Sequence, residues 1–105
     1  MTHLNRAIYR LGNKSEKDLY EKGLFPTQHN GRSVHFSEIK DALSFYKNNK
    51  NKTHSKDNEM DVMYTLIVDK SSKPICTSVK NGKCKSLFFD KNNFPKIIMV
   101  KSETL

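Results

Sequence analysis

Glycine is scarce in this sequence of 105 residues: only four are present, scattered at positions 12, 23, 31 and 82. A dinucleotide-binding fingerprint and a phosphate-binding loop both need glycines close together, so neither motif is present. The four histidines form no i, i+4 pair and have no carboxylate at ligand spacing, so we expect no metal site. A nucleophile elbow for a Ser-His-Asp hydrolase is also missing. The sequence therefore gives no motif for a Rossmann-type, phosphate-loop, metal-dependent or Ser-His-Asp enzyme.

Long apolar runs are missing as well. No stretch is long enough to span a bilayer, and no charged-then-apolar leader stands at the N-terminus. We therefore expect a cytoplasmic protein that does not enter a membrane.

Cysteine occurs only twice, at Cys76 and Cys84, and this spacing matches no zinc site or redox pair. The Asn81-Gly82 pair predicts a two-residue hairpin turn, in which Val79 lies opposite Cys84. Side chains alternate along a strand, so this register places the two cysteines on opposite faces of the sheet. We expect reduced, structural thiols.

Arginine is also scarce, with three copies among nineteen basic residues. The whole chain has a net charge of +8. Residues 1–46 carry seven basic and five acidic side chains, whereas residues 47–105 carry twelve and six. A basic excess favours contact with nucleic acid. The alternative is a solvated Lys-rich surface, since an AT-rich genome also encodes much Lys and Asn.

The length fits one domain, spanning residues 1–105. In its first half we expect a strand over 5–11 with Ala7, Tyr9 and Leu11 on one face. A short helix follows, with Ser15 as its N-cap and Gly23 just past its end. A second strand, "SVHF", leads into a helix that reaches about residue 48. Its expected cap is Ser37 and its expected buried face is Ile39, Ala42, Leu43 and Tyr46.

The second half is expected to be mostly sheet. Residues 47–59 form a polar Lys/Asn-rich loop. After it come a central strand over 61–69, the hairpin over 73–90 and a last strand over 95–102 with a buried interior. The fold class is therefore α+β: two short helices in the N-terminal half, packed on a mostly antiparallel sheet of about six strands.

Three segments resemble the opening half of the ADP-ribosyltransferase superfamily: "AIYR", "LYEKGLFP" and "GRSVHFSEIKDALSFY". In that family a first strand carries a His or Arg, a helix ends in a Gly-hydrophobic-x-Pro step, and a strand then runs into a helix that ends in Tyr. The resemblance covers about residues 5–70 and extends to small toxins and phage proteins. It implies a transferase that uses NAD to modify a host macromolecule, in a bacterial or phage-infected host cell.

The resemblance also implies roles for particular residues. Arg10 would bind the adenosine ribose or a phosphate, and His35 falls on the first position of the family signature. Glu103 is the only late glutamate, so it is the candidate for the acid that stabilises the transition state. The candidate catalytic residues are therefore Arg10, His35 and Glu103, and the candidate NAD-binding residues are Tyr9, Arg10, Ser37, Ser44 and Tyr46.

Structural roles compete with these assignments. Arg10 could be a solvent-facing residue paired with Glu16 or Asp18, His35 a hydrogen-bonded structural histidine, and Tyr46 a core residue.

Two other functions also stay open. One is a non-catalytic basic module that binds nucleic acid or a host protein through its Lys-rich sheet. The other is a small ribonuclease with His35 and Glu38 as base and acid and with Arg10 or Arg32 on the phosphate. The transferase interpretation requires Arg10, His35, Tyr46 and Glu103 around one pocket, whereas a scattered arrangement favours the binding module.

Overall fold

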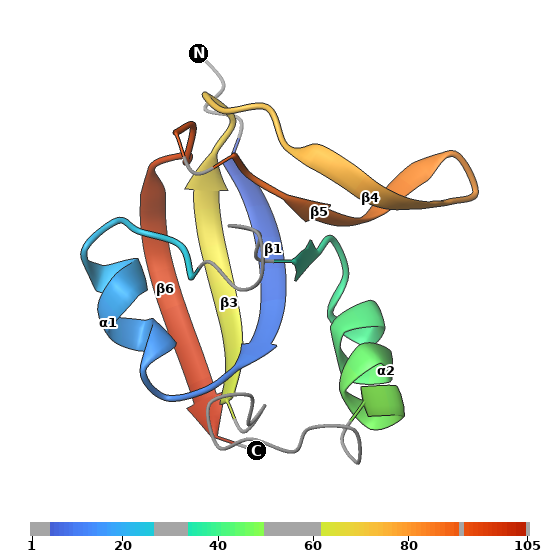
Figure 1. The fold of residues 1–105 in the computed structure, drawn as a ribbon, viewed down its shortest axis with the longest axis horizontal. Helices are drawn as coiled ribbons and strands as arrows, with labels where there is room; N and C mark the ends of the chain where they lie inside the picture. Colours follow the sequence, from blue (N-terminus) through green and yellow to red (C-terminus); the bar gives the residue numbers. More distant parts are fainter. Residues whose placement is uncertain (1–4, 27–33, 50–61, 91, 105) are drawn as a thin grey trace.

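The computed structural model describes residues 5–26, 34–49, 62–90 and 92–104. Within these ranges the chain forms two helices and six strands, and Figure 1 shows the helices beside a single sheet. The α+β prediction is confirmed, with both helices in the N-terminal half. The segment 25–32, with its Asn30-Gly31 pair, lies largely outside the described residues, as does Arg32. So does most of the expected loop 47–59.

The sheet has the strand order β4-β5-β2-β1-β3-β6, and all neighbours are antiparallel. Its longest strands lie side by side: β1 (Asn5–Gly12), β3 (Val62–Asp69) and β6 (Ile97–Thr104). The strand β2 (His35–Phe36) has only two residues and connects β1 to β5 (Lys83–Phe88), which pairs with β4 (Ile75–Lys80). The predicted central strand is confirmed, because β3 lies between β1 and β6.

Each face of the sheet carries one helix and one apolar core. Because side chains alternate along β1, Ile8 points to the core beneath α1 (Glu16–Glu21), while Tyr9 and Leu11 point to the core beneath α2 (Ile39–Asn49). The predicted shared face of Tyr9 and Leu11 is therefore confirmed. No helix in the described ranges is long and apolar enough to cross a membrane.

The end of α1 agrees with the sequence. Gly23 has φ +77°, a left-handed conformation that costs glycine little. Its N–H donates to the Tyr20 carbonyl at 3.0 Å, and the Leu24 N–H donates to the Leu19 carbonyl at 2.9 Å. These two bonds form a Schellman motif, which satisfies carbonyls that the helix leaves free.

The buried face predicted for α2 is wrong in part. Ala42 is buried and Tyr46 is half-buried, but Ile39 and Leu43 are 48% and 43% exposed. The helix packs mainly on β1 and the two-residue β2, and this surface is too narrow to cover the whole apolar face of α2.

The buried interior predicted for the last strand is also wrong. Ile98 and Met99 of β6 are 50% and 55% exposed. The strand lies at the edge of the sheet and pairs with β3 on one side only. An apolar run does not distinguish an edge strand from a central one.

The β4–β5 hairpin turns at Asn81 and Gly82, as predicted. Both residues have positive φ, at 53° and 76°, which is the backbone of a type I′ turn. Figure 1 shows the hairpin reaching sideways from the rest of the sheet, and every residue of β4 is exposed.

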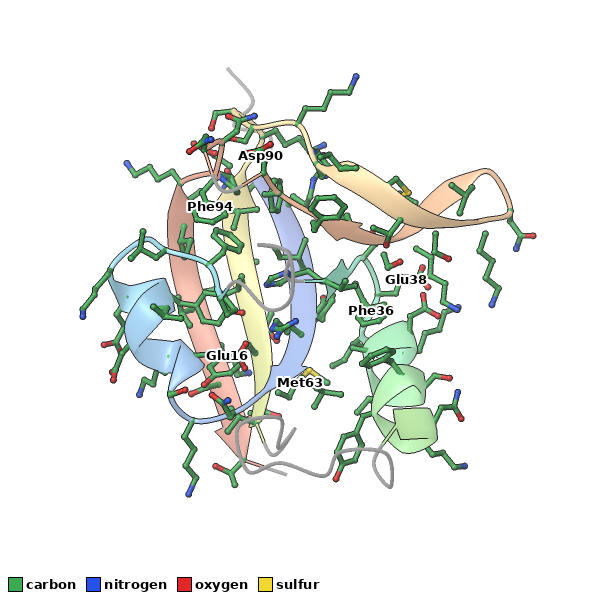
Figure 2. All side chains as sticks on the ribbon, viewed as in Figure 1. Glu16, Phe36, Glu38, Met63, Asp90 and Phe94 are labelled. Atoms are coloured by element: carbon green, nitrogen blue, oxygen red, sulfur yellow. A yellow bond between two sulfur atoms is a disulfide. The ribbon has the colours of Figure 1, made fainter. Side chains whose placement is uncertain are left out.

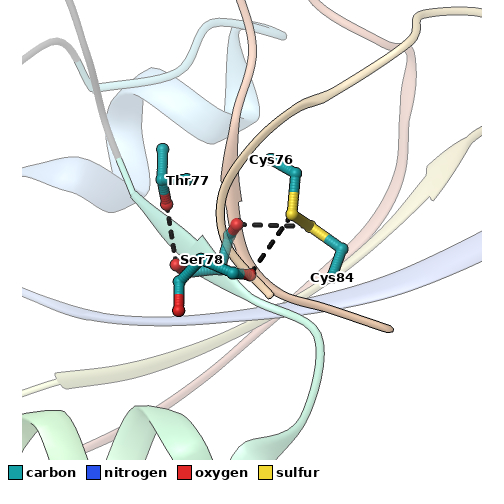
Figure 3. Close-up of a disulfide and its surroundings, with 5 residues drawn as sticks. Cys76, Thr77, Ser78 and Cys84 are labelled. Atoms are coloured by element: carbon teal, nitrogen blue, oxygen red, sulfur yellow. Dashed lines mark hydrogen bonds between the residues drawn. A yellow bond between two sulfur atoms is a disulfide. The ribbon is translucent and has the colours of Figure 1, made fainter. Parts of the chain in front are cut away.

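The prediction of reduced cysteines is wrong, because Cys76 and Cys84 form a disulfide (Figure 3). Their Cα atoms lie 5.8 Å apart. The predicted pairing of Val79 with Cys84 does occur, and Cys76 lies opposite Leu87, but two opposite register shifts lie between these two pairs. One shift removes Thr77 from the residue-to-residue register with β5, although its hydroxyl is hydrogen-bonded to that of Ser86, and the other removes Lys85 from the register with β4. These bulges break the strict alternation on which the prediction depended.

Candidate functional site

Arg10 is buried beneath α1 and makes two hydrogen bonds. Its Nε donates to Glu16 Oε1 at 2.6 Å, and its Nη1 donates to the Val34 carbonyl at 3.0 Å. Both side chains of the ion pair are more than nine-tenths buried. The predicted pairing with Glu16 is therefore confirmed, but the expectation that the pair faces solvent is wrong. Arg10 joins the helix, β1 and the segment before β2.

Glu16 completes a compact polar arrangement. Its second oxygen, Oε2, accepts a hydrogen bond from the Asn13 N–H at 2.6 Å. A Cβ at position 12 would overlap this carboxylate, so only glycine fits there. Ser15 precedes the helix but makes no side-chain capping bond, and its hydroxyl donates to Asn13 Oδ1 instead. Ser15 is therefore the N-cap residue of α1, as predicted, but it makes no capping bond because its hydroxyl donates to Asn13.

His35 is completely buried on the same face of the sheet. Its Nε2 lies 3.1 Å from the Tyr20 hydroxyl, and its ring packs edge-on against Tyr20 and Phe25. A histidine enclosed in this way cannot reach an external substrate without local unfolding. The geometry is that of the structural, hydrogen-bonded histidine.

Burial raises the pKa of Tyr20 well above its ordinary value, an effect that the positive charge of Arg10 partly offsets. In the unfolded chain Tyr20 ionises near its usual pKa of about 10, so above that pH the unfolded state releases a proton that the folded state keeps. This contribution to stability is complete below about pH 10 and is lost as the pH rises.

We therefore expect the free energy of unfolding to fall above about pH 10, by up to about 1.4 kcal/mol per pH unit. Urea unfolding at several alkaline pH values measures this slope. Tyr20→Phe should make the slope shallower, while Tyr9→Phe, on the other face, should leave it unchanged. Equal slopes in wild type and Tyr20→Phe would contradict the assignment.

The remaining candidates for the NAD site lie elsewhere. Tyr9 and Tyr46 pack in the core beneath α2, on the opposite face of the sheet from Arg10 and His35. Ser44 is exposed on α2. Glu103 is exposed on the edge strand β6, with its carboxylate 3.6 Å from Lys101 Nζ.

The four residues that the transferase interpretation requires in one pocket are therefore scattered over both faces and one edge of the sheet. The core position of Tyr46 matches its structural alternative. The ribonuclease pair is also separated, since His35 is enclosed beneath α1 and Glu38 is exposed beside α2.

A groove of about 350 Å³ lies between the N-terminal turn of α2 and the β4–β5 hairpin. Figure 2 shows Glu38 at this end of α2, facing the hairpin. The pairing of β2 with β5 creates the groove, because the chain leaves β2 directly into α2 and the Ser37 N–H donates to the Lys85 carbonyl at 3.0 Å. The lining residues are Ser37, Glu38, Lys40, Asp41, Lys80, Asn81, Lys83, Cys84 and Lys85.

The residue just before α2 is Glu38, which places Ser37 one position too early for the predicted helix cap. Ser37 is half-buried in the wall of the groove. It is the one candidate NAD-binding residue that lines this groove.

The hairpin side of the groove is basic. Lys80 and Lys83 lie directly opposite each other across the two strands, and Lys85 follows two residues later. In the part of the chain that the structure describes, none of these three lysines forms an ion pair, whereas Lys40 on the helix side pairs with Glu38 at 3.3 Å. The hairpin therefore carries an unbalanced positive charge. Like charges directly opposite in a sheet destabilise it, so the pair Lys80 and Lys83 lowers the stability of the hairpin.

The basic side of this groove could be predicted from the sequence, because the three lysines flank the predicted Asn81-Gly82 turn. It does not show that β5 pairs with β2, which brings α2 beside them. Among the described residues no three His, Cys, Asp or Glu side chains gather as a metal site would require.

Comparisons of the chain with protein-family models, with curated proteins and with solved structures find no significant match.

Proposed function

We propose that this protein is a non-catalytic module that binds nucleic acid through the groove between α2 and the β4–β5 hairpin. The observation that carries the proposal is the set of Lys80, Lys83 and Lys85 along one side of this groove, none of which forms an ion pair with another described residue. Lysines placed in this way bind phosphates and release counterions, which supplies most of the affinity in sequence-independent binding.

The shape of the hairpin supports the proposal. A projecting two-stranded ribbon presents side chains away from the body of the protein, and the disulfide joins its two strands. Two-stranded ribbons and positively charged grooves are both used to hold nucleic acids. The transferase and ribonuclease hypotheses stay predictions from the sequence, and the scattered positions of their residues give them less support.

The experiment measures fluorescence anisotropy of labelled oligonucleotides, both single-stranded and duplex. We expect binding to weaken steeply between about 50 and about 200 mM salt, with a slope of about −2 in log K against log salt for three phosphate contacts to a single strand. The triple change Lys80→Glu, Lys83→Glu, Lys85→Glu should weaken binding at least about tenfold.

A matched triple change on α1 and its flanks, Lys14→Glu, Lys17→Glu, Lys22→Glu, alters the net charge equally at exposed positions on the other face of the sheet. It should change affinity by no more than about threefold, because screening limits the reach of a charge to about 10 Å. Equal losses in the two triple variants, or no binding by wild type, would refute the proposal.

A further inference from the structure

Asp41 is the least explained side chain of the groove. It is nine-tenths buried and lines the groove, yet within the described ranges its carboxylate has no hydrogen-bond or ion-pair partner. A buried charge without partners is costly, and most buried polar groups in proteins are satisfied. The N-terminal turn of α2 favours a negative charge at this position, but it provides no donor to the side chain.

The two sides of the groove therefore require two different properties of one ligand, hydrogen-bond donors on the α2 side and negative charge on the hairpin side. A carboxylate only accepts hydrogen bonds, so a ligand must present donors to Asp41. The same ligand must present negative charge to Lys83 and Lys85 on the hairpin side. Phosphate alone fails the first requirement, because its unprotonated oxygens only accept hydrogen bonds. Glu38 and Asp41 also repel it from this end of α2.

A nucleotide meets both requirements, and among the common bases guanine fits best. Its N1–H and its exocyclic N2 amino group are adjacent donors, so both oxygens of one carboxylate can accept from it. Adenine, cytosine and uracil each place an acceptor beside their donor on this edge. A groove of about 350 Å³ falls within the range of ligand sites, which begins near ~300 Å³.

We propose that the groove takes an unpaired guanine of a single-stranded nucleic acid, with Asp41 accepting from N1–H and N2–H and the hairpin lysines holding the adjacent phosphates. This inference rests on the proposed function and adds the base to it. The base must be unpaired because Watson–Crick pairing uses the same edge, and single-stranded recognition commonly reads that edge.

The experiment uses labelled nonamers of uridine in which the central base is guanosine, inosine, adenosine or cytidine. Wild type should bind the guanosine nonamer at least about tenfold more tightly than the adenosine nonamer, since a bidentate contact is worth about 1–3 kcal/mol. Inosine lacks the N2 amino group and should fall between them.

Asp41→Asn keeps the shape of the side chain but replaces one acceptor by a donor. The variant should bind all four nonamers within about threefold of one another and should keep the wild-type salt slope. Glu21→Gln removes an exposed acid on α1 and should keep the preference for guanosine. Thermal melting of both variants verifies that they are folded.

Each outcome is decisive. Equal binding of all nonamers by wild type, or an unchanged preference in Asp41→Asn, would overturn the guanine inference and leave the proposed function standing. No binding of any nonamer would overturn the guanine inference, and no binding of the duplex oligonucleotide as well would overturn both. Direct binding of a labelled arginine-rich peptide to wild type, lost in Asp41→Asn, together with no preference among the nonamers, would assign the groove to a protein partner instead.

Discussion

Replacing Arg10 by methionine should lower the free energy of unfolding by about 3–5 kcal/mol. The change leaves the Glu16 carboxylate buried without its strongest partner and frees the Val34 carbonyl. Because small domains have a total stability of only about 5–15 kcal/mol, much of the population would unfold at moderate denaturant. Equilibrium unfolding in urea measures the loss.

An exposed ion pair provides the control. Lys101→Met breaks the contact with Glu103 on the surface of β6 and should cost less than about 1 kcal/mol. The double change Arg10→Met, Glu16→Leu should recover part of the loss, since it removes both charges. The recovery is incomplete because the Asn13 N–H also loses its acceptor. A loss below about 1 kcal/mol in Arg10→Met would show that the buried pair is not a structural element.

The transferase hypothesis has its own thermal test. Because the residues that it requires are scattered over the sheet, millimolar NAD should leave the melting temperature of wild type unchanged. A rise with NAD in wild type would restore the transferase interpretation.

Removal of the disulfide is the second large effect. Cys76→Ser, Cys84→Ser opens a loop that joins residues eight positions apart, and chain entropy predicts a loss of about 2–3 kcal/mol. Because β4 is exposed along its whole length, we expect the hairpin to open before the core does. Amide hydrogen exchange with and without reductant distinguishes hairpin opening from global unfolding.

The double serine variant should show the same amide hydrogen exchange with and without reductant. Reduced wild type should then match this variant in exchange across β4 and β5. Identical exchange in oxidised and reduced wild type would show that the disulfide does not hold the hairpin closed.

Much of the fold could be predicted from local patterns. Positive φ at Asn81, Gly82 and Gly23 follows from steric rules, and these residues mark the hairpin and the end of α1 correctly. Alternation along β1 gives the correct shared face for Tyr9 and Leu11. These features depend on near neighbours in the chain.

The other features depend on contacts distant in sequence. No local sequence pattern shows that β6 is an edge strand or that two bulges bring the cysteines together. Nor does one show that β2 is too short to cover the apolar face of α2. Alternation already places neighbours such as Tyr9 and Arg10 on opposite faces of the sheet. Only the topology decides which helix covers each face and how the other candidate residues lie relative to one another.

The absence of a side chain at Gly12 has a consequence for how this sequence can diverge. The Glu16 carboxylate occupies the space that a Cβ would need, so a substitution at position 12 expels the acid that neutralises Arg10. The residues at positions 10, 12 and 16 are therefore sterically and electrostatically coupled. We expect related sequences either to keep Arg10, Gly12 and Glu16 together or to replace Arg10 and Glu16 by apolar residues first. Once Glu16 is replaced, its carboxylate no longer prevents a larger residue at position 12.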